Sequence, residues 1–222
     1  AIVLGWLSGF NNWADENLLL ELLIPSLKSN PNLYFVCTGG AYSDLPNGKY
    51  EKVYKSLKKA KLLGQCRLLN WVHNKYVADI ISQFHLGLNT DLDCLESHFG
   101  ARNRITDLIA NGVPVLSTDY SEVASQLSLF GIGIGFTHFE KEKVKEFLKT
   151  LTLADVKLYR KNLKTFNKAQ KLTNYMQDLT AYLKQPFKAN LACLKTSQLK
   201  TLRYYLRQHG LKKLLQKIIA KI

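Results

Sequence analysis

Short apolar runs alternate along most of the chain with longer stretches in which apolar residues recur at helical spacing. A short apolar run is typical of a buried strand, and the helical recurrence is typical of an amphipathic helix. The predicted strands are Ala1–Trp6, Leu33–Thr38, Cys66–Leu69, His85–Asn89, Val113–Ser117 and Ile132–Phe136. The predicted helices are Asn17–Leu27, Tyr50–Leu63, Lys75–Gln83, Arg104–Asn111, Ser121–Phe130, Glu142–Leu151 and Ala154–Gln170. This alternation predicts an α/β fold with a Rossmann-like, doubly wound parallel sheet.

After Pro186 the pattern changes to a single amphipathic stretch. Leucine and isoleucine recur at helical steps between Leu199 and Ile222, and lysine and arginine occupy the positions opposite them. This spacing predicts a basic amphipathic helix, with Gly210 as the point where it can break. We therefore predict a Rossmann-like domain over residues 1–185 and a basic helical extension over residues 186–222.

The composition fits a folded chain with one substantial core, because 46% of its 222 residues are hydrophobic. Residues 179–222 contain ten lysines and arginines and no acid, so they carry most of the formal net charge of +14. Residues 195–222 could contact an anionic membrane surface, which is the favoured interpretation. Packing on a partner helix or on the chain's own core is the second alternative, and nucleic-acid binding is the least favoured.

Several absences bear on location. No apolar run approaches the roughly 20 residues that a membrane-spanning helix needs, and no export signal is visible. We therefore expect a cytoplasmic protein, peripheral at the inner face of the membrane if its basic extension binds there. Because the sequence begins directly on a strand-like run, we also expect that a natural N-terminal part precedes it.

The four cysteines are widely scattered, and no pair has the spacing of a metal or redox site. Cys37 and Cys66 fall within apolar runs, as structural thiols do. We expect all four, including Cys94 and Cys193, to be reduced.

Residues 95–122 hold the densest candidate chemistry. A polar loop with Glu96 leads into a short helix that carries Arg102, Arg104 and Asp107. Amide groups at a helix start lack partners within the helix and attract anions, and arginines strengthen that attraction. Asp107 lies three residues beyond Arg104, so the acid can accept hydrogen bonds from a diol beside a bound phosphate. This arrangement suits a sugar nucleotide.

The same stretch resembles the donor-binding signature of GT-B glycosyltransferases of the family 4 type. A subgroup of these enzymes has the pattern E-x2-F-x2-R-x-R-x2-D-x4-G-x-P-V-x2-T. The matching residues are Glu96, Phe99, Arg102, Arg104, Asp107, Gly112, Pro114, Val115 and Thr118. The resemblance covers roughly residues 1–136, although Glu96 and Asp107 stand eleven apart where the commoner pattern has two glutamates eight apart.

The resemblance implies a role for each matching group. Amides around Ala101–Arg104, together with both arginines, would stabilise the charge that grows on a departing diphosphate, which makes Arg102 and Arg104 catalytic candidates. Asp107 would hold the ribose hydroxyl groups. Glu96, the third catalytic candidate, would contact the donor sugar or its neighbouring phosphate. Phe99, Gly100 and Thr118 are further donor-binding candidates.

Loops after three other predicted strands add donor-binding candidates on the ligand side of the sheet. Ser8 and Gly9 follow the first strand, where small residues permit close approach to a diphosphate, although an ordinary turn explains them equally. Gly39 follows the second strand, where a glycine often only turns the chain. Trp71 and Val72 follow the third strand and would seat the base, unless Trp71 is a core or rim aromatic.

Asp91 and Asp93 imitate the Asp-x-Asp metal motif of a different glycosyltransferase architecture. GT-B enzymes do not need that motif, so we interpret both residues as solvated loop acids and expect neither a metal nor a cofactor other than the nucleotide-sugar substrate.

These observations predict the C-terminal, nucleotide-sugar-binding domain of a hexosyltransferase-type GT-B enzyme. The whole enzyme would transfer the sugar to a glycan or lipid-linked acceptor, with retention of configuration and without a metal. Because its acceptor domain would be missing, we expect this chain alone to be inactive. The alternative is a non-catalytic Rossmann-like module whose basic tail binds a membrane or nucleic acid.

Overall fold

A computed structural model describes residues 1–7, 9–40, 48–169 and the single positions 176, 180 and 184. Its centre is a six-stranded sheet of entirely parallel strands in the order β3-β2-β1-β4-β5-β6. The strands are β1 Ile2–Trp6, β2 Leu33–Cys37, β3 Cys66–Leu68, β4 Leu86–Asn89, β5 Val115–Thr118 and β6 Gly133–Phe136. The predicted doubly wound sheet is thus confirmed. Strand order reverses between β1 and β4, where folds of this kind bind ligands beyond the strand ends.

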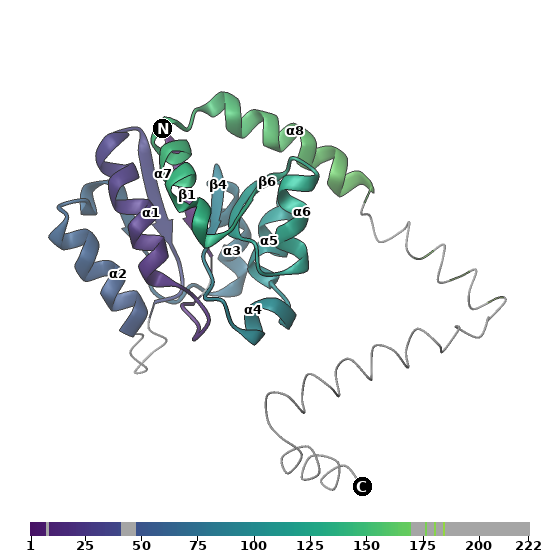
Figure 1. Ribbon diagram of the computed structural model, residues 1–222, viewed down its shortest axis with the longest axis horizontal. Helices are drawn as coiled ribbons and strands as arrows, with labels where there is room; N and C mark the ends of the chain where they lie inside the picture. Colours follow the sequence, from purple (N-terminus) through teal and green to yellow (C-terminus); the bar gives the residue numbers. More distant parts are fainter. Residues whose placement is uncertain (8, 41–47, 170–175, 177–179, 181–183, 185–222) are drawn as a thin grey trace, which may run out of the picture. The chain divides into compact units, whose positions relative to one another are not determined.

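Helices cover both faces of the sheet (Figure 1). They are α1 Glu16–Ser29, α2 Gly48–Lys59, α3 Val77–Ser82, α4 Leu95–Phe99, α5 Asn103–Ala110, α6 Glu122–Leu129, α7 Lys141–Thr150 and α8 Leu153–Ala169, with short 3-10 turns η1 Leu63–Gln65, η2 Asn74–Tyr76 and η3 His138–Glu140. One apolar core joins α1, α2 and α7 to the sheet, and a second joins α3, α5, α6 and α8 to it. Each predicted helix up to residue 169 therefore exists, and α4 is an addition.

Side chains at two helix starts satisfy amides that the helices leave unpaired. Asp15 accepts hydrogen bonds from the amides of Asn17 and Leu18 at the start of α1. Ser121 accepts one from the amide of Ala124 and begins α6. Such caps fix where a helix begins, and α6 begins on the carboxyl-end side of the sheet.

Glycines in the two central strands let the second core pack closely. A Cβ on Gly5 would lie 2.0 Å from Phe84 Cδ2, and one on Gly87 would lie 2.5 Å from Leu108 Cδ1. Because Leu108 belongs to α5, the missing side chain on β4 lets α5 approach the sheet. The start of α5 thereby lies near the ends of β1 and β4.

The three cysteines within the described residues are unpaired thiols, as predicted, and Cys37 and Cys66 are buried. Burial raises the pKa of Cys66 to about 11 and that of Cys37 further. Both thiols are therefore protonated and unreactive at neutral pH. Cys193 lies outside the described residues.

Contacts divide the chain into two units, residues 1–171 and residues 172–222. The predicted boundary at residue 185 and the basic extension lie outside the described residues, so both stay predictions. Within the described part of the chain, no helix is long and apolar enough to cross a membrane.

Candidate functional site

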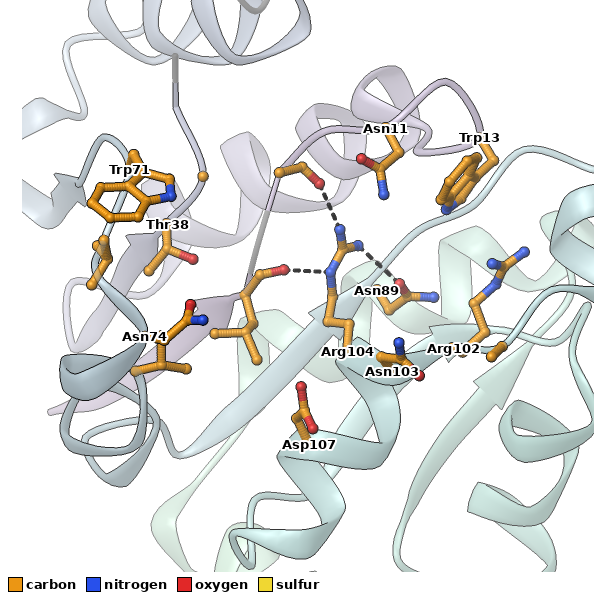
Figure 2. A pocket seen from close by; sticks show the side chains of 16 residues that line it. Asn11, Trp13, Thr38, Trp71, Asn74, Asn89, Arg102, Asn103, Arg104 and Asp107 are labelled. Carbon is orange, nitrogen blue, oxygen red and sulfur yellow. Dashed lines mark hydrogen bonds between the residues drawn. The ribbon is translucent and has the colours of Figure 1, made fainter. Parts of the chain in front are cut away.

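A cavity of about 490 Å³ opens at the carboxyl ends of β1, β2 and β3, beside the start of α5 (Figure 2). This volume lies within the roughly 300–1,000 Å³ of ordinary ligand sites. The cavity gathers seven of the residues predicted from the sequence, which are Gly9, Gly39, Trp71, Val72, Arg102, Arg104 and Asp107. Segments far apart in the sequence thus meet in one place, where the strand order reverses.

Of the predicted site residues that the structure describes, four do not line the cavity. Thr118 is buried, and its hydroxyl accepts a hydrogen bond from the Asp91 amide at 2.9 Å. Phe99 is 83% exposed on α4. Glu96 and Gly100 lie in and directly after α4, and Ser8 lies outside the described residues. For these five residues, direct contact with a donor stays a prediction.

Arg104 extends from the first turn of α5 into the wall of the cavity (Figure 2). Its Nε donates to the Leu7 carbonyl at 2.5 Å, its Nη2 to the Gly9 carbonyl at 2.8 Å, and its Nη1 to Asn89 Oδ1 at 2.9 Å. Burial lowers the pKa of the guanidinium to about 10, against the pull of the Asp91 carboxylate. Arg104 is therefore still a cation at neutral pH.

Arg102 precedes α5 and is a second buried cation with an acidic partner. Its Nε lies 3.0 Å from Asp91 Oδ2, and its Nη2 donates to the Glu96 carbonyl. Arg102 also lies over the ring of Trp13, 5.7 Å from its centroid. The Arg102 guanidinium thus contacts Asp91 and a carbonyl group, and that of Arg104 contacts carbonyl groups and Asn89.

One expectation about the loop after β4 is wrong, and another is confirmed. Asp91 is only 4% exposed and pairs with Arg102, whereas a solvated acid was predicted. The burial has a long-range cause, because Ala14 forms a bridge to Asp91 and the chain after β1 covers it. Asp93 is exposed as predicted and lies 2.7 Å from His98 Nε2.

Glu96 lies on a helix, not on the predicted polar loop. Its side chain is half exposed, with Oε1 3.9 Å from Arg102 Nη1. A Cβ on Gly100 would lie 2.1 Å from that carboxylate oxygen and 2.6 Å from the Glu96 carbonyl. Glycine is therefore required where the chain turns back over α4, and the turn brings Ala101 and Arg102 to the cavity.

Asp107 lies one turn beyond Arg104 on α5, and its carboxylate extends toward the cavity (Figure 2). The residue is exposed. Among the described residues, no hydrogen bond or ion pair of this carboxylate is found. An acid in this setting can accept hydrogen bonds from a ligand without first losing a partner.

The wall formed by the loop after β3 carries the apolar surface. Trp71 is half exposed and lines the cavity with Val72. His73 has a local role, because its Nδ1 accepts a hydrogen bond from the Lys75 amide at the start of η2. On the neighbouring loop Gly39 has a φ of +83°, which glycine adopts without strain.

Sequence reasoning missed four asparagines that line the cavity, namely Asn11, Asn74, Asn89 and Asn103. Asn89 is the most buried, at 2% exposure, and ends the apolar strand β4. A polar residue at the end of a buried strand was the available signal for it. Asn11 lies in the loop after β1, whereas Asn74 and Asn103 are the first residues of η2 and α5. Asparagine is common in loops and at helix starts for local reasons.

Among the residues that the structure describes, no group of three or more histidine, cysteine or acidic residues could hold a metal ion. The expectation of metal-independent chemistry stays a prediction.

Comparisons with known proteins connect this geometry to a fold. No protein-family model matches the sequence, and curated proteins give no match. Among solved structures, a TarM variant from S. aureus in complex with Fondaparinux, alpha-GlcNAc-glycerol and UDP matches 81% of this chain and 34% of its own, with a TM-score of 0.62 and 13% identity.

Two further structures give similar values. WaaG, a glycosyltransferase involved in lipopolysaccharide biosynthesis, matches 84% of this chain and 47% of its own, with a TM-score of 0.63 and 15% identity. HepE of Anabaena, in complex with UDP and glucose, matches 82% and 48%, with a TM-score of 0.64 and 13% identity. The chain thus spans half or less of these structures. At the level of the fold, the predicted likeness to the C-terminal domain of GT-B glycosyltransferases is confirmed.

Proposed function

We propose that the cavity binds a nucleotide-sugar and that the chain is the donor-binding half of a glycosyltransferase. The observation that carries the proposal is the convergence of three features at the strand-order reversal. The start of α5 with two buried arginines faces the cavity, the Asp107 carboxylate extends toward it, and Trp71 forms its opposite wall. These features match the three parts of a nucleoside diphosphate, which are an anion, a diol and a flat base.

Each part of the donor has a partner of suitable chemistry. The diphosphate would lie at the first turn of α5, where amides lack partners within the helix. Arg102 and Arg104 keep positive charge beside that turn. Asp107 would accept hydrogen bonds from the ribose hydroxyl groups, and Trp71 with Val72 would contact the base.

The proposed chemistry is departure of a charged leaving group. As the bond between the sugar and the diphosphate breaks, negative charge grows on the terminal phosphate. Fixed dipoles and nearby cations stabilise that charge without rearranging, which lowers the barrier. Glu96, at the edge of α4, would act on the sugar or its neighbouring phosphate.

The remaining parts of the proposal concern the whole enzyme. It would be a hexosyltransferase that uses a glycan or lipid-linked acceptor, retains configuration and needs no metal. The acceptor and its catalytic surroundings would come from a further N-terminal domain, so this chain alone would bind nucleotide weakly and turn over little. The location would be the cytoplasm, with contact to the inner face of an anionic membrane through residues 195–222.

Calorimetric titration of the chain with UDP, GDP and ADP tests the proposal. We expect one site per chain, with one base preferred. If none of the three binds while anionic vesicles or RNA bind with a steep salt dependence, the chain is instead a non-catalytic binding module. Deletion of residues 195–222 should abolish binding to anionic vesicles, and a deletion that unfolds the protein would assign that segment to the core.

A further inference from the structure

The Arg104 guanidinium donates hydrogen bonds to other groups of the protein. Two of its nitrogens donate to the carbonyls of Leu7 and Gly9, on the loop that follows β1 (Figure 2). The third donates to Asn89 at the end of β4. One side chain from α5 therefore joins the ends of the two strands between which the sheet order reverses.

The same guanidinium stacks on an aromatic pair. Arg104 Cζ lies 4.0 Å from the centroid of the Trp6 ring. The rings of Trp6 and Phe10 are parallel to within 7°, with centroids 4.6 Å apart. Trp6 ends β1 and Phe10 lies in the loop after it. Stacking and hydrogen bonding thus hold the same loop from two directions.

Asn89 connects Arg104, through Asp91, to the second arginine of the site, Arg102. Its Oδ1 accepts from Arg104, and its Nδ2 donates to Asp91 Oδ2 at 3.1 Å and to Ser117 Oγ at 3.0 Å. The Asp91 carboxylate in turn pairs with Arg102. An amide side chain suits this position, because its oxygen accepts from the cation while its NH2 group has two N–H donors, one for the carboxylate and one for the hydroxyl group.

We propose that Arg104 is a positioning residue, which shapes the diphosphate end of the cavity by holding the loop after β1 and does not grip the phosphate with its own N–H groups. The inference rests on the proposed function for the identity of the ligand. Its physical reason is that a buried cation needs its hydrogen bonds satisfied. Turning the guanidinium to a phosphate would leave the carbonyls of Leu7 and Gly9 without this donor.

The first test measures the loop without any ligand. In Arg104→Lys the charge remains, but one ammonium group cannot reproduce the planar fork that reaches Leu7, Gly9 and Asn89 together. We expect faster amide hydrogen exchange in residues 7–13 of the nucleotide-free variant, with unchanged exchange in α1 and α7. Unchanged exchange in residues 7–13 would overturn the proposal. So would faster exchange throughout the domain, which would mark a general structural role.

The second test leaves the arginine in place and weakens the aromatic pair on which it stacks. Phe10→Leu removes the ring that stacks on Trp6, and Phe10 does not line the cavity. If Arg104 acts through the loop, this variant should bind UDP roughly five- to tenfold more weakly, in the range of a lost interaction of modest strength, while uridine binding changes little. Unchanged UDP affinity would support direct contact of Arg104 with phosphate and contradict the proposal.

The two tests separate this inference from the proposed function. If the unaltered chain does not bind UDP, the proposed function fails, and hydrogen exchange alone then decides whether Arg104 holds the loop. If UDP binds but the loop is unaffected in Arg104→Lys, the proposed function stands and the positioning role fails.

Discussion

Two arginines that are neighbours in the site differ in what holds them. Arg102 pairs with the Asp91 carboxylate, whereas Arg104 relies on carbonyls, an amide oxygen and an aromatic face. Asp107, on the same helix as Arg104, is exposed and lines the cavity, and its carboxylate has no hydrogen bond or ion pair among the described residues. At the scale of single residues, the two arginines are therefore held by the protein, and we propose that Asp107 binds the ligand.

Replacing Asp107 by Ala tests that separation. The variant should bind UDP roughly tenfold more weakly, because hydrogen bonds to a charged group contribute about 1.5–3 kcal/mol, and its melting temperature should not change since the residue is exposed. Calorimetry and thermal unfolding measure the two quantities. Glu146→Gln, which removes an exposed acid on α7, is the matched control and should bind UDP normally. Equal affinities for both variants would remove Asp107 from the site.

The roles of these residues were only partly predictable from the sequence. Arg102, Arg104 and Asp107 could be placed beside a ligand site because their spacing and a family pattern agree. The burial of Asp91 could not be predicted, since it depends on the chain after β1 returning to cover it. Asn89 was missed as well, although it ends a buried strand and contacts both Arg104 and Asp91.

At the scale of elements, apolar runs located all six strands and helical periodicity located every longer helix. The exception is α4, which spans only Leu95–Phe99. A helix this short shows no period, and its polar residues suggested a loop. The position of α4 is fixed by the tight turn at Gly100. It is also fixed by the Glu96 carbonyl, which accepts hydrogen bonds from the Gly100 amide and the Arg102 side chain. Such contacts are invisible in the sequence.

The pairing of β6 with β5 depends on the absence of a side chain at Gly133. A Cβ there would lie 2.0 Å from the Val115 carbonyl oxygen, a backbone atom that cannot turn aside. Gly133→Ala should lower the free energy of unfolding by at least the roughly 1–3 kcal/mol typical of overpacking. Gly64→Ala is the control, because no atom lies within 4 Å of its added Cβ. Urea unfolding that shows the same change in both variants would contradict this packing.

Glu16 joins α1 to α2 through an ionic contact whose effect depends on pH. Its Oε1 lies 3.0 Å from Lys52 Nζ, and its Oε2 lies 3.4 Å from Lys49 Nζ. Burial raises the pKa of Glu16, but the hydrogen bond from Lys52 and the charge of both lysines outweigh it, so the pKa falls below the ordinary 4.5. The stabilisation is thus complete above 4.5 and disappears as the pH falls through the lowered value.

Glu16→Gln should therefore reduce the free energy of unfolding by about 1 kcal/mol at neutral pH. The difference from the unaltered chain should shrink as the solution is acidified below pH 4.5 and through the lowered pKa of Glu16. Urea unfolding at several pH values measures both. A difference that stays constant, or grows, on acidification would show that the lysines do not stabilise the ionised acid.

At the scale of the whole molecule, the carboxyl ends of β1, β2 and β3 and the start of α5 surround one cavity, on a fold shared with the compared glycosyltransferases. We propose that this cavity binds a nucleoside diphosphate. The arrangement of Trp71, Asp107 and the start of α5 around the cavity supports both the class of ligand and its orientation.

Determining the structure of the chain with UDP bound tests this claim most directly. We expect the base against Trp71 and Val72, the ribose hydroxyl groups on Asp107, and the diphosphate at the first turn of α5. The Arg104 side chain should remain on the carbonyls of Leu7 and Gly9. A nucleotide bound elsewhere on the chain, or one in this cavity with its diphosphate turned away from α5, would contradict the account.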